Sequence, residues 1–125
     1  MNSEFYPRPV FHVRDVAASV AYYCEKLGFS KNWGEDSEPI IAQVGRGDLE
    51  IILESEAAMP TAAVPSVLSA TLRENRLDAL HEELRDLGAK IRREPFDVSW
   101  DDGVRQFEVE DLAGNVLVFW GENPG

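Results

Sequence analysis

The sequence is poor in cysteine and in long apolar runs. Cys24 is the only cysteine among the 125 residues, so no disulfide can form within the chain, and a reducing cytoplasm is the expected compartment. No apolar run approaches the roughly 20 residues that a membrane-spanning helix needs, and the first ten residues lack the apolar core of a signal peptide. We therefore expect a cytoplasmic protein without a membrane anchor.

Positive charge is also scarce. Lys and Arg number 12 against 23 Asp and Glu, which gives a formal net charge of −11. A chain of that sign repels phosphate backbones and anionic lipids, so the sequence argues against nucleic-acid and membrane partners and favours cations. The charge also keeps a protein soluble without any further role. No glycine-rich phosphate loop or Ser-His-Asp pattern occurs, and Cys24 has no neighbouring base to activate it.

The remaining composition is that of one folded domain, residues 1–125, with 44% hydrophobic and 28% charged residues. The first half predicts a strand over 8–14, a helix over 16–27 capped by Asp15 and ended by Gly28, and a hairpin of strands 40–44 and 49–53. Residues 29–38 are polar and predict a loop, and 54–66 predict a linker.

The second half repeats this order. It predicts a strand over 67–72, a helix over 76–87 capped by Asn75 and ended by Gly88, a short strand at Ile91 interrupted by Pro95, and a hairpin of strands 106–110 and 116–120. Gly28 and Gly88 lie 60 residues apart. The sequence therefore predicts an α+β fold of paired βαβββ modules, about 6–56 and 66–122, whose sheets lie side by side with the helices outside and a cleft within.

Strand alternation assigns the residues that face this cleft. Symmetric pairing around residues 45–48 sets Val44 opposite Leu49 and puts Ile40, Ala42, Val44, Leu49, Ile51 and Leu53 on the core face. In the last hairpin, apolar Phe107 and Val109 alternate with polar residues, so one face is acidic. Trp33 and Trp100 are predicted to lie in loops, where they are candidates for the walls of the cleft. The predicted ligand-binding set is Trp33, Ile41, Gln43, Glu50, Ile52, Ser69, Trp100, Gln106, Glu108, Glu110, Val118 and Trp120.

Two segments carry a resemblance to a known family. The first is Val13-Arg14-Asp15 with Ser19, Tyr22-Tyr23 and Leu27-Gly28-Phe29, and the second is Phe107-Glu108-Val109-Glu110-Asp111 with Gly114-Asn115-Val116-Leu117. Together with the repeat, they resemble the vicinal oxygen chelate (glyoxalase/bleomycin resistance/dioxygenase) superfamily. Catalytic members hold a divalent metal at four strand positions. By the resemblance, those positions fall here on Arg8, Glu50, Val67 and Val118.

Arginine and valine offer no lone pair to a metal, so the resemblance implies neither a metal nor a catalytic residue here. His12 shares a face with Arg8 and leaves open an improvised metal site with Glu50. Arg8 is also placed to neutralise Glu50. His81 lies amid charged residues, which predicts the solvated side of its helix.

Within this superfamily, a chain without the metal ligands most resembles the bleomycin resistance proteins, which are non-catalytic dimers. It implies antibiotic resistance by sequestration of a cationic, aromatic drug of the bleomycin class in clefts of a homodimer, without a cofactor. An acidic face interleaved with apolar and aromatic side chains suits such a ligand by stacking, cation–π contact and charge pairing. Two alternatives stay open: a metal-dependent glyoxalase- or dioxygenase-type enzyme, and a binding domain for another small metabolite.

Overall fold

The computed structural model describes residues 4–58 and 64–122. The first module consists of β1 (Val10–Val13), α1 (Val16–Lys26), β2 (Ser30–Gly34), β3 (Ile41–Arg46) and β4 (Leu49–Ser55), followed by the 3₁₀ turn η1 (Glu56–Ala58). The second consists of β5 (Val67–Thr71), α2 (Leu77–Leu87), β6 (Lys90–Asp97), β7 (Val104–Glu110) and β8 (Val116–Glu122). Part of the predicted linker, residues 59–63, lies outside the described residues.

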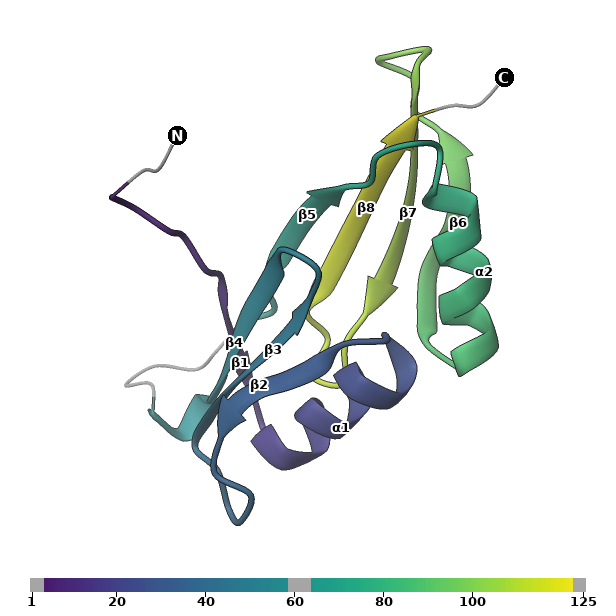
Figure 1. Cartoon of the computed structure of the whole chain (residues 1–125). Coiled ribbons are helices and arrows are strands. Elements are labelled where there is room, and N and C mark those ends of the chain that lie inside the picture. Colours follow the sequence, from purple (N-terminus) through teal and green to yellow (C-terminus); the bar gives the residue numbers. More distant parts are fainter. Residues whose placement is uncertain (1–3, 59–63, 123–125) are drawn as a thin grey trace.

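The two modules form sheets of the same topology. The first sheet has the order β1-β4-β3-β2 and the second β5-β8-β7-β6. In each, the strand before the helix pairs in parallel with the last strand of its module, and the other pairs are antiparallel. The predicted α+β fold of paired βαβββ modules is therefore confirmed. Figure 1 shows α1 against the first sheet and α2 against the second.

The predicted residue marks the helix end in three of four cases. The Asp15 carboxylate accepts a hydrogen bond from the Ala18 N–H at 3.0 Å, so it caps α1 as predicted. Gly28 (φ 74°) and Gly88 (φ 90°) take the left-handed conformation that ends each helix. The predicted cap of α2 is wrong. Asn75 itself is left-handed (φ 55°), and Arg76 occupies the cap position without a side-chain hydrogen bond.

One strand was missed and another was predicted too short, and both lie at sheet edges. β2 falls in the segment predicted to be a loop, and it tolerates polar residues because it has one partner strand, β3. β6 is longer than predicted and passes through Pro95. The β6–β7 register slips between Arg93 and Phe96, around the proline, and proline fits an edge strand at such an irregularity.

The first hairpin has a register two residues away from the prediction. Val44 lies opposite Ile51 rather than Leu49, because the connecting loop is only Gly47 and Asp48. A shift of two residues leaves every side chain on its predicted face. Ala42, Val44, Ile51 and Leu53 are accordingly fully buried, whereas Ile40 lies before β3 and is 69% exposed, contrary to prediction.

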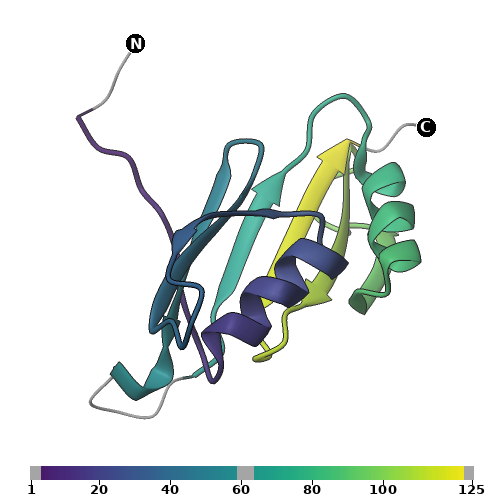
Figure 2. The same ribbon diagram turned by 60° about the horizontal axis from the view of Figure 1, so that its bottom comes forward.

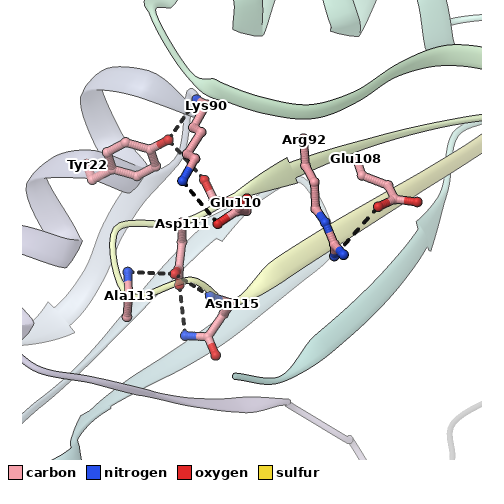
Figure 3. A network of polar contacts seen from close by, with 8 residues as sticks. All are labelled: Tyr22, Lys90, Arg92, Glu108, Glu110, Asp111, Ala113 and Asn115. Atoms are coloured by element: carbon pink, nitrogen blue, oxygen red, sulfur yellow. Dashed lines mark hydrogen bonds and ion pairs between the residues drawn. The ribbon is translucent and has the colours of Figure 1, made fainter. Parts of the chain in front are cut away.

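A buried polar cluster joins the two modules. The Tyr23 hydroxyl of α1 donates to Asp111 Oδ2 at 2.9 Å, and Tyr22 donates to the Glu110 carbonyl oxygen at 3.0 Å. Asn115 donates from Nδ2 to Asp111 (Figure 3) and also to the His12 carbonyl oxygen. Figure 2 shows the result, with α1 lying across the base of the β7–β8 hairpin. This cluster fixes how the two sheets meet.

Candidate functional site

Each sheet has one face turned away from its helix, which we call its open face. On the first sheet it carries Val10, His12, Ile41, Gln43, Glu50, Ile52 and Glu54, which alternate with the buried residues that pack under α1. On the second sheet it carries Val67, Ser69, Gln106, Glu108, Glu110, Val118 and Trp120. The strand residues of the predicted ligand-binding set all lie on these faces, including Trp33 of edge strand β2, which pairs with Gln43.

The second open face holds a chain of contacts that begins with two tryptophans. Trp100, in the loop between β6 and β7, meets Trp120 edge to face with 5.9 Å between ring centroids. The Trp120 indole Nε1 donates to Gln106 Oε1 at 2.8 Å, and Gln106 Nε2 donates to Glu108 Oε2 at 2.8 Å. Trp100 remains 64% exposed. The structure therefore brings four predicted site residues together and holds one indole in a fixed orientation.

The acidic residues of this face have basic partners that the sequence reading missed. Arg93 approaches the buried Glu108 carboxylate at 3.9 Å. Figure 3 shows Arg92, which approaches the same carboxylate at 3.8 Å, and Lys90, which approaches Glu110 at 3.3 Å. All three cations come from β6, whose predicted strand was too short to bring them here. Because β6 pairs with β7, its register could have located them. The face is therefore charge-balanced and not simply acidic.

The first open face differs, because one of its carboxylates lacks a partner. Arg8 donates to Gln43 Oε1 at 2.7 Å, and Gln43 Nε2 donates to Asn32 at 2.9 Å, so the Gln43 amide is already engaged. Within the described residues, Glu50 Oε1 is buried and has no hydrogen-bond partner. The sequence had suggested that Arg8 neutralises Glu50. Arg8 instead bonds Gln43. A buried acceptor without a donor favours a ligand that supplies one.

The remaining predicted residues line the edges of these faces. Trp33 lies in β2 opposite Gln43, not in a loop, and is 41% exposed. With Ile41 it lines a hollow of about 310 Å³. Ile52 pairs with Gln43, and Ser69 pairs with Val118, both on the open faces. Trp33 and Ile41 are thus brought together beside Gln43, at the β2 edge of the first sheet.

His12 does not form the metal site with Glu50 that the sequence left open, and His81 does not take its expected position. His12 Nε2 lies 2.9 Å from Glu54 Oε1, its neighbour on β4, so it pairs with Glu54 and not with Glu50. His81 is buried, not solvated: its ring packs edge to face on Phe107 at 5.3 Å, and its Nε2 contacts Glu94. It follows the buried stripe of α2 because it lies one turn after Leu77 and one residue after Leu80.

The four positions implied by the resemblance do not supply a metal centre. Arg8 and Glu50 belong to the first open face, and Val67 and Val118 to the second. Guanidinium and isopropyl groups cannot ligate a cation, so one carboxylate remains. Within residues 4–58 and 64–122, no three His, Cys, Asp or Glu side chains gather as a metal site. The residues present do not fit the divalent metal of the catalytic relatives.

Hollows of about 570, 310 and 190 Å³ lie on the described surface, and these three are not lined by Glu50, Glu108 or Trp120. The 570 Å³ hollow lies instead on the helix side, between α2 and the β3–β4 loop. Sequence reasoning missed it, because its residues come from segments that were assigned only to packing and turns. Among the described residues, no helix has the length and apolar character needed to cross a membrane.

Solved structures share this fold. A glyoxalase/bleomycin resistance protein/dioxygenase from Alicyclobacillus acidocaldarius superposes with a TM-score of 0.77 at 16% identity, covering 97% of this chain and 93% of that one. A lactoylglutathione lyase from Agrobacterium tumefaciens gives 0.74 at 11% identity, covering 97% and 96%. TioX from Micromonospora sp. ML1 gives 0.70 at 18% identity, covering 94% and 100%.

A search of curated proteins returned no significant match. The sequence profile of one family, however, matches residues 7–119, nearly the whole chain and both modules. Together with the paired βαβββ topology, that match establishes that the chain belongs to the Glyoxalase/Bleomycin resistance protein/Dioxygenase superfamily.

Proposed function

We propose that this protein binds a flat, aromatic, cationic small molecule of the bleomycin class and holds it without transforming it. The observation that carries the proposal is the tryptophan pair of the second open face, in which Trp120 is fixed by Gln106 while Trp100 stays exposed. An oriented indole gives a planar ring a surface to stack on, at little entropic cost, and gives a cation a π face. We propose antibiotic sequestration as the biological role.

Glu50 supplies the second element of the proposal. Its buried oxygen has no donor among the described residues, so a ligand cation or N–H group that reaches it removes a desolvation penalty. The net charge of −11 attracts such a ligand over a longer range. Absence of ligating groups at Arg8, Val67 and Val118 supports binding over metal-assisted turnover.

We further propose that two copies of the chain form the cleft. The Glu50 face and the Trp120 face belong to different sheets, and the hollows of about 570, 310 and 190 Å³ contain neither residue. A homodimer that sets the first open face of one copy against the second open face of the other would enclose both. The protein is proposed to act in the cytoplasm, as one domain of modules about 6–56 and 66–122, with neither nucleic acid nor membrane as partner.

The charge balance of the second open face favours a second candidate, a ligand outside the bleomycin class. Lys90, Arg92 and Arg93 offset Glu108 and Glu110, so this face also accepts a neutral or zwitterionic aromatic metabolite. The two candidates differ in their dependence on ligand charge. A cationic ligand binds more tightly at low ionic strength, whereas a neutral one does not respond to salt.

Thermal unfolding with bleomycin-class ligands tests the proposal. A ligand at 100 times its dissociation constant stabilises the folded protein by about 2.7 kcal/mol, which raises the unfolding temperature. Trp120→Ala removes the stacking surface and is expected to abolish this shift, and Glu50→Gln is expected to reduce it. Glu82→Gln, an exposed substitution on α2, is the matched control. The absence of any shift at saturating drug would reject the bleomycin-class proposal and leave the metabolite alternative.

A further inference from the structure

The 570 Å³ hollow on the helix side lies where the modules meet, away from both open faces. It is formed by the end of α1, the β3–β4 loop, the β5–α2 loop and one side of α2. Its apolar lining includes Leu27, Phe29, Leu49, Leu80, Leu84 and Phe119. The volume falls within the range of roughly 300–1,000 Å³ that small-molecule sites occupy. None of its lining residues belongs to the proposed drug site.

The rim of this hollow is positively charged, although the chain as a whole is acidic. Arg46, Arg73 and Arg76 line it against Asp48 and Glu83. Arg46 and Glu83 neutralise each other through two hydrogen bonds of 2.8 Å. The Arg46 hydrogen bond is also the main reason that the pKa of Glu83 lies below its usual value, and Arg76 adds to the effect.

Two arginines of the rim remain available. Within the described part of the chain, the side chains of Arg73 and Arg76 are exposed and make no hydrogen bond or ion pair, and Asp48 is the one rim carboxylate not neutralised by an arginine. Arg76 also starts α2 without a side-chain cap, so the amino end of an 11-residue helix adds partial positive charge. An apolar floor under two unengaged guanidinium groups is complementary to one kind of ligand.

We propose that this hollow binds a soluble amphiphilic carboxylate, such as a medium-chain fatty acid. Its alkyl chain lies over Leu80, Leu84 and Phe119, and its carboxylate is held at the rim by Arg73 and Arg76. Guanidinium groups bind carboxylates through charge-assisted hydrogen bonds, and the buried chain contributes through loss of its contact with water. This site is separate from the proposed drug site and does not depend on it.

Calorimetric titration of the full chain with octanoate, decanoate and dodecanoate tests this site. Each added methylene that enters the hollow should strengthen binding about fourfold. Nonyltrimethylammonium, which has the same nine-carbon alkyl chain as decanoate and the opposite charge, should bind more weakly than decanoate. Arg73→Gln and Arg76→Gln should each weaken the binding of decanoate about threefold. Arg85→Gln, on the same helix and outside the hollow, should leave the affinity for decanoate unchanged.

Ala79→Phe provides an independent test, because Ala79 lines the hollow from an exposed position on α2, where a larger side chain blocks the site without entering the core. Loss of decanoate binding in this variant, with binding retained in Trp120→Ala, supports the proposal. Three results overturn it: no decanoate binding, affinity unchanged by both arginine substitutions, or loss of decanoate binding in Trp120→Ala. The last would place the fatty acid on the open face.

Discussion

At the residue scale, Gln106 does more than its position in the sequence indicates. Alternation along β7 places it on the open face, which the structure bears out, but alternation gives no information about partners. The structure shows that its amide oxygen accepts from Trp120 and its amide nitrogen donates to Glu108. One residue therefore orients the aromatic surface and satisfies a buried carboxylate at the same time.

Replacing Gln106 by Met removes both hydrogen bonds while keeping a side chain of similar length. The buried Glu108 loses a donor, so we expect a loss of about 1–3 kcal/mol in the free energy of unfolding. The indole of Trp120 also loses its acceptor and becomes free to rotate. Urea unfolding and tryptophan fluorescence measure the two effects. A variant as stable as the parent, with unchanged emission, would contradict this role for Gln106.

Tyr23 gives a prediction for alkaline pH. Burial first, and then the neighbouring Asp111 carboxylate, raise the pKa of Tyr23 well above its usual value of 10.0. The unfolded chain therefore ionises this hydroxyl before the folded protein does. The contribution of Tyr23 to stability is complete below pH 10 and is lost as the pH rises toward the folded-state pKa.

Tyr23→Phe tests this prediction. The variant should be less stable at pH 8 by about 1–3 kcal/mol, because Asp111 loses a donor. Its free energy of unfolding should then decline less steeply between pH 9 and 11 than that of the parent. Tyr22, whose pKa burial also raises, accounts for the residual slope. Equal slopes for variant and parent would show that Tyr23 is not the titrating group.

At the element scale, the sequence was sufficient to predict the ends of an element wherever a single residue decides the local geometry. Asp15 caps α1, and the two helix-ending glycines adopt positive φ as predicted. The sequence was insufficient where pairing with a neighbouring strand decides the local structure. β2 and the longer β6 are polar edge strands, and each is held as a strand by its hydrogen bonds to one neighbour. The cations of β6 were missed for the same reason, so the second open face was expected to be acidic.

Asp15→Ala tests the cap that positions α1 on the first sheet. The Ala18 N–H loses its acceptor, and we expect the free energy of unfolding to fall by about 1 kcal/mol. Asp48→Ala removes an exposed aspartate from a loop outside the helices and serves as control. Chemical denaturation of both variants gives the comparison. Equal stability of the two would mean that the cap contributes little to the fold.

At the scale of the whole molecule, the modules are held by a small buried cluster and by a shared hydrophobic core. Both open faces remain accessible in the single chain, and they carry different groups: an unpartnered carboxylate on one, an ordered tryptophan pair on the other. Strand alternation located these faces, because the repeat fixes strand order. It could not locate the helix-side hollow, which arises from the packing of one module on the other.

The proposed dimer has a direct consequence for mass in solution. If the open faces of two copies enclose the ligand, sedimentation should give twice the chain mass of 14.0 kDa at micromolar concentration. Val118→Arg, which places a charge on the second open face, should shift the protein toward the single-chain mass. A protein that sediments as one chain with and without ligand would contradict the dimeric cleft.

The open faces are proposed to bind a drug-like ligand without a metal. Calorimetric titration of chelator-treated protein with a metal-free, bleomycin-class ligand tests this proposal most directly, with Trp120→Ala as the matched variant. We expect saturable binding of the parent protein, unchanged by added divalent cations, and loss of that binding in Trp120→Ala. Binding that appears only after a divalent metal is restored, or that persists in Trp120→Ala, would contradict the proposal.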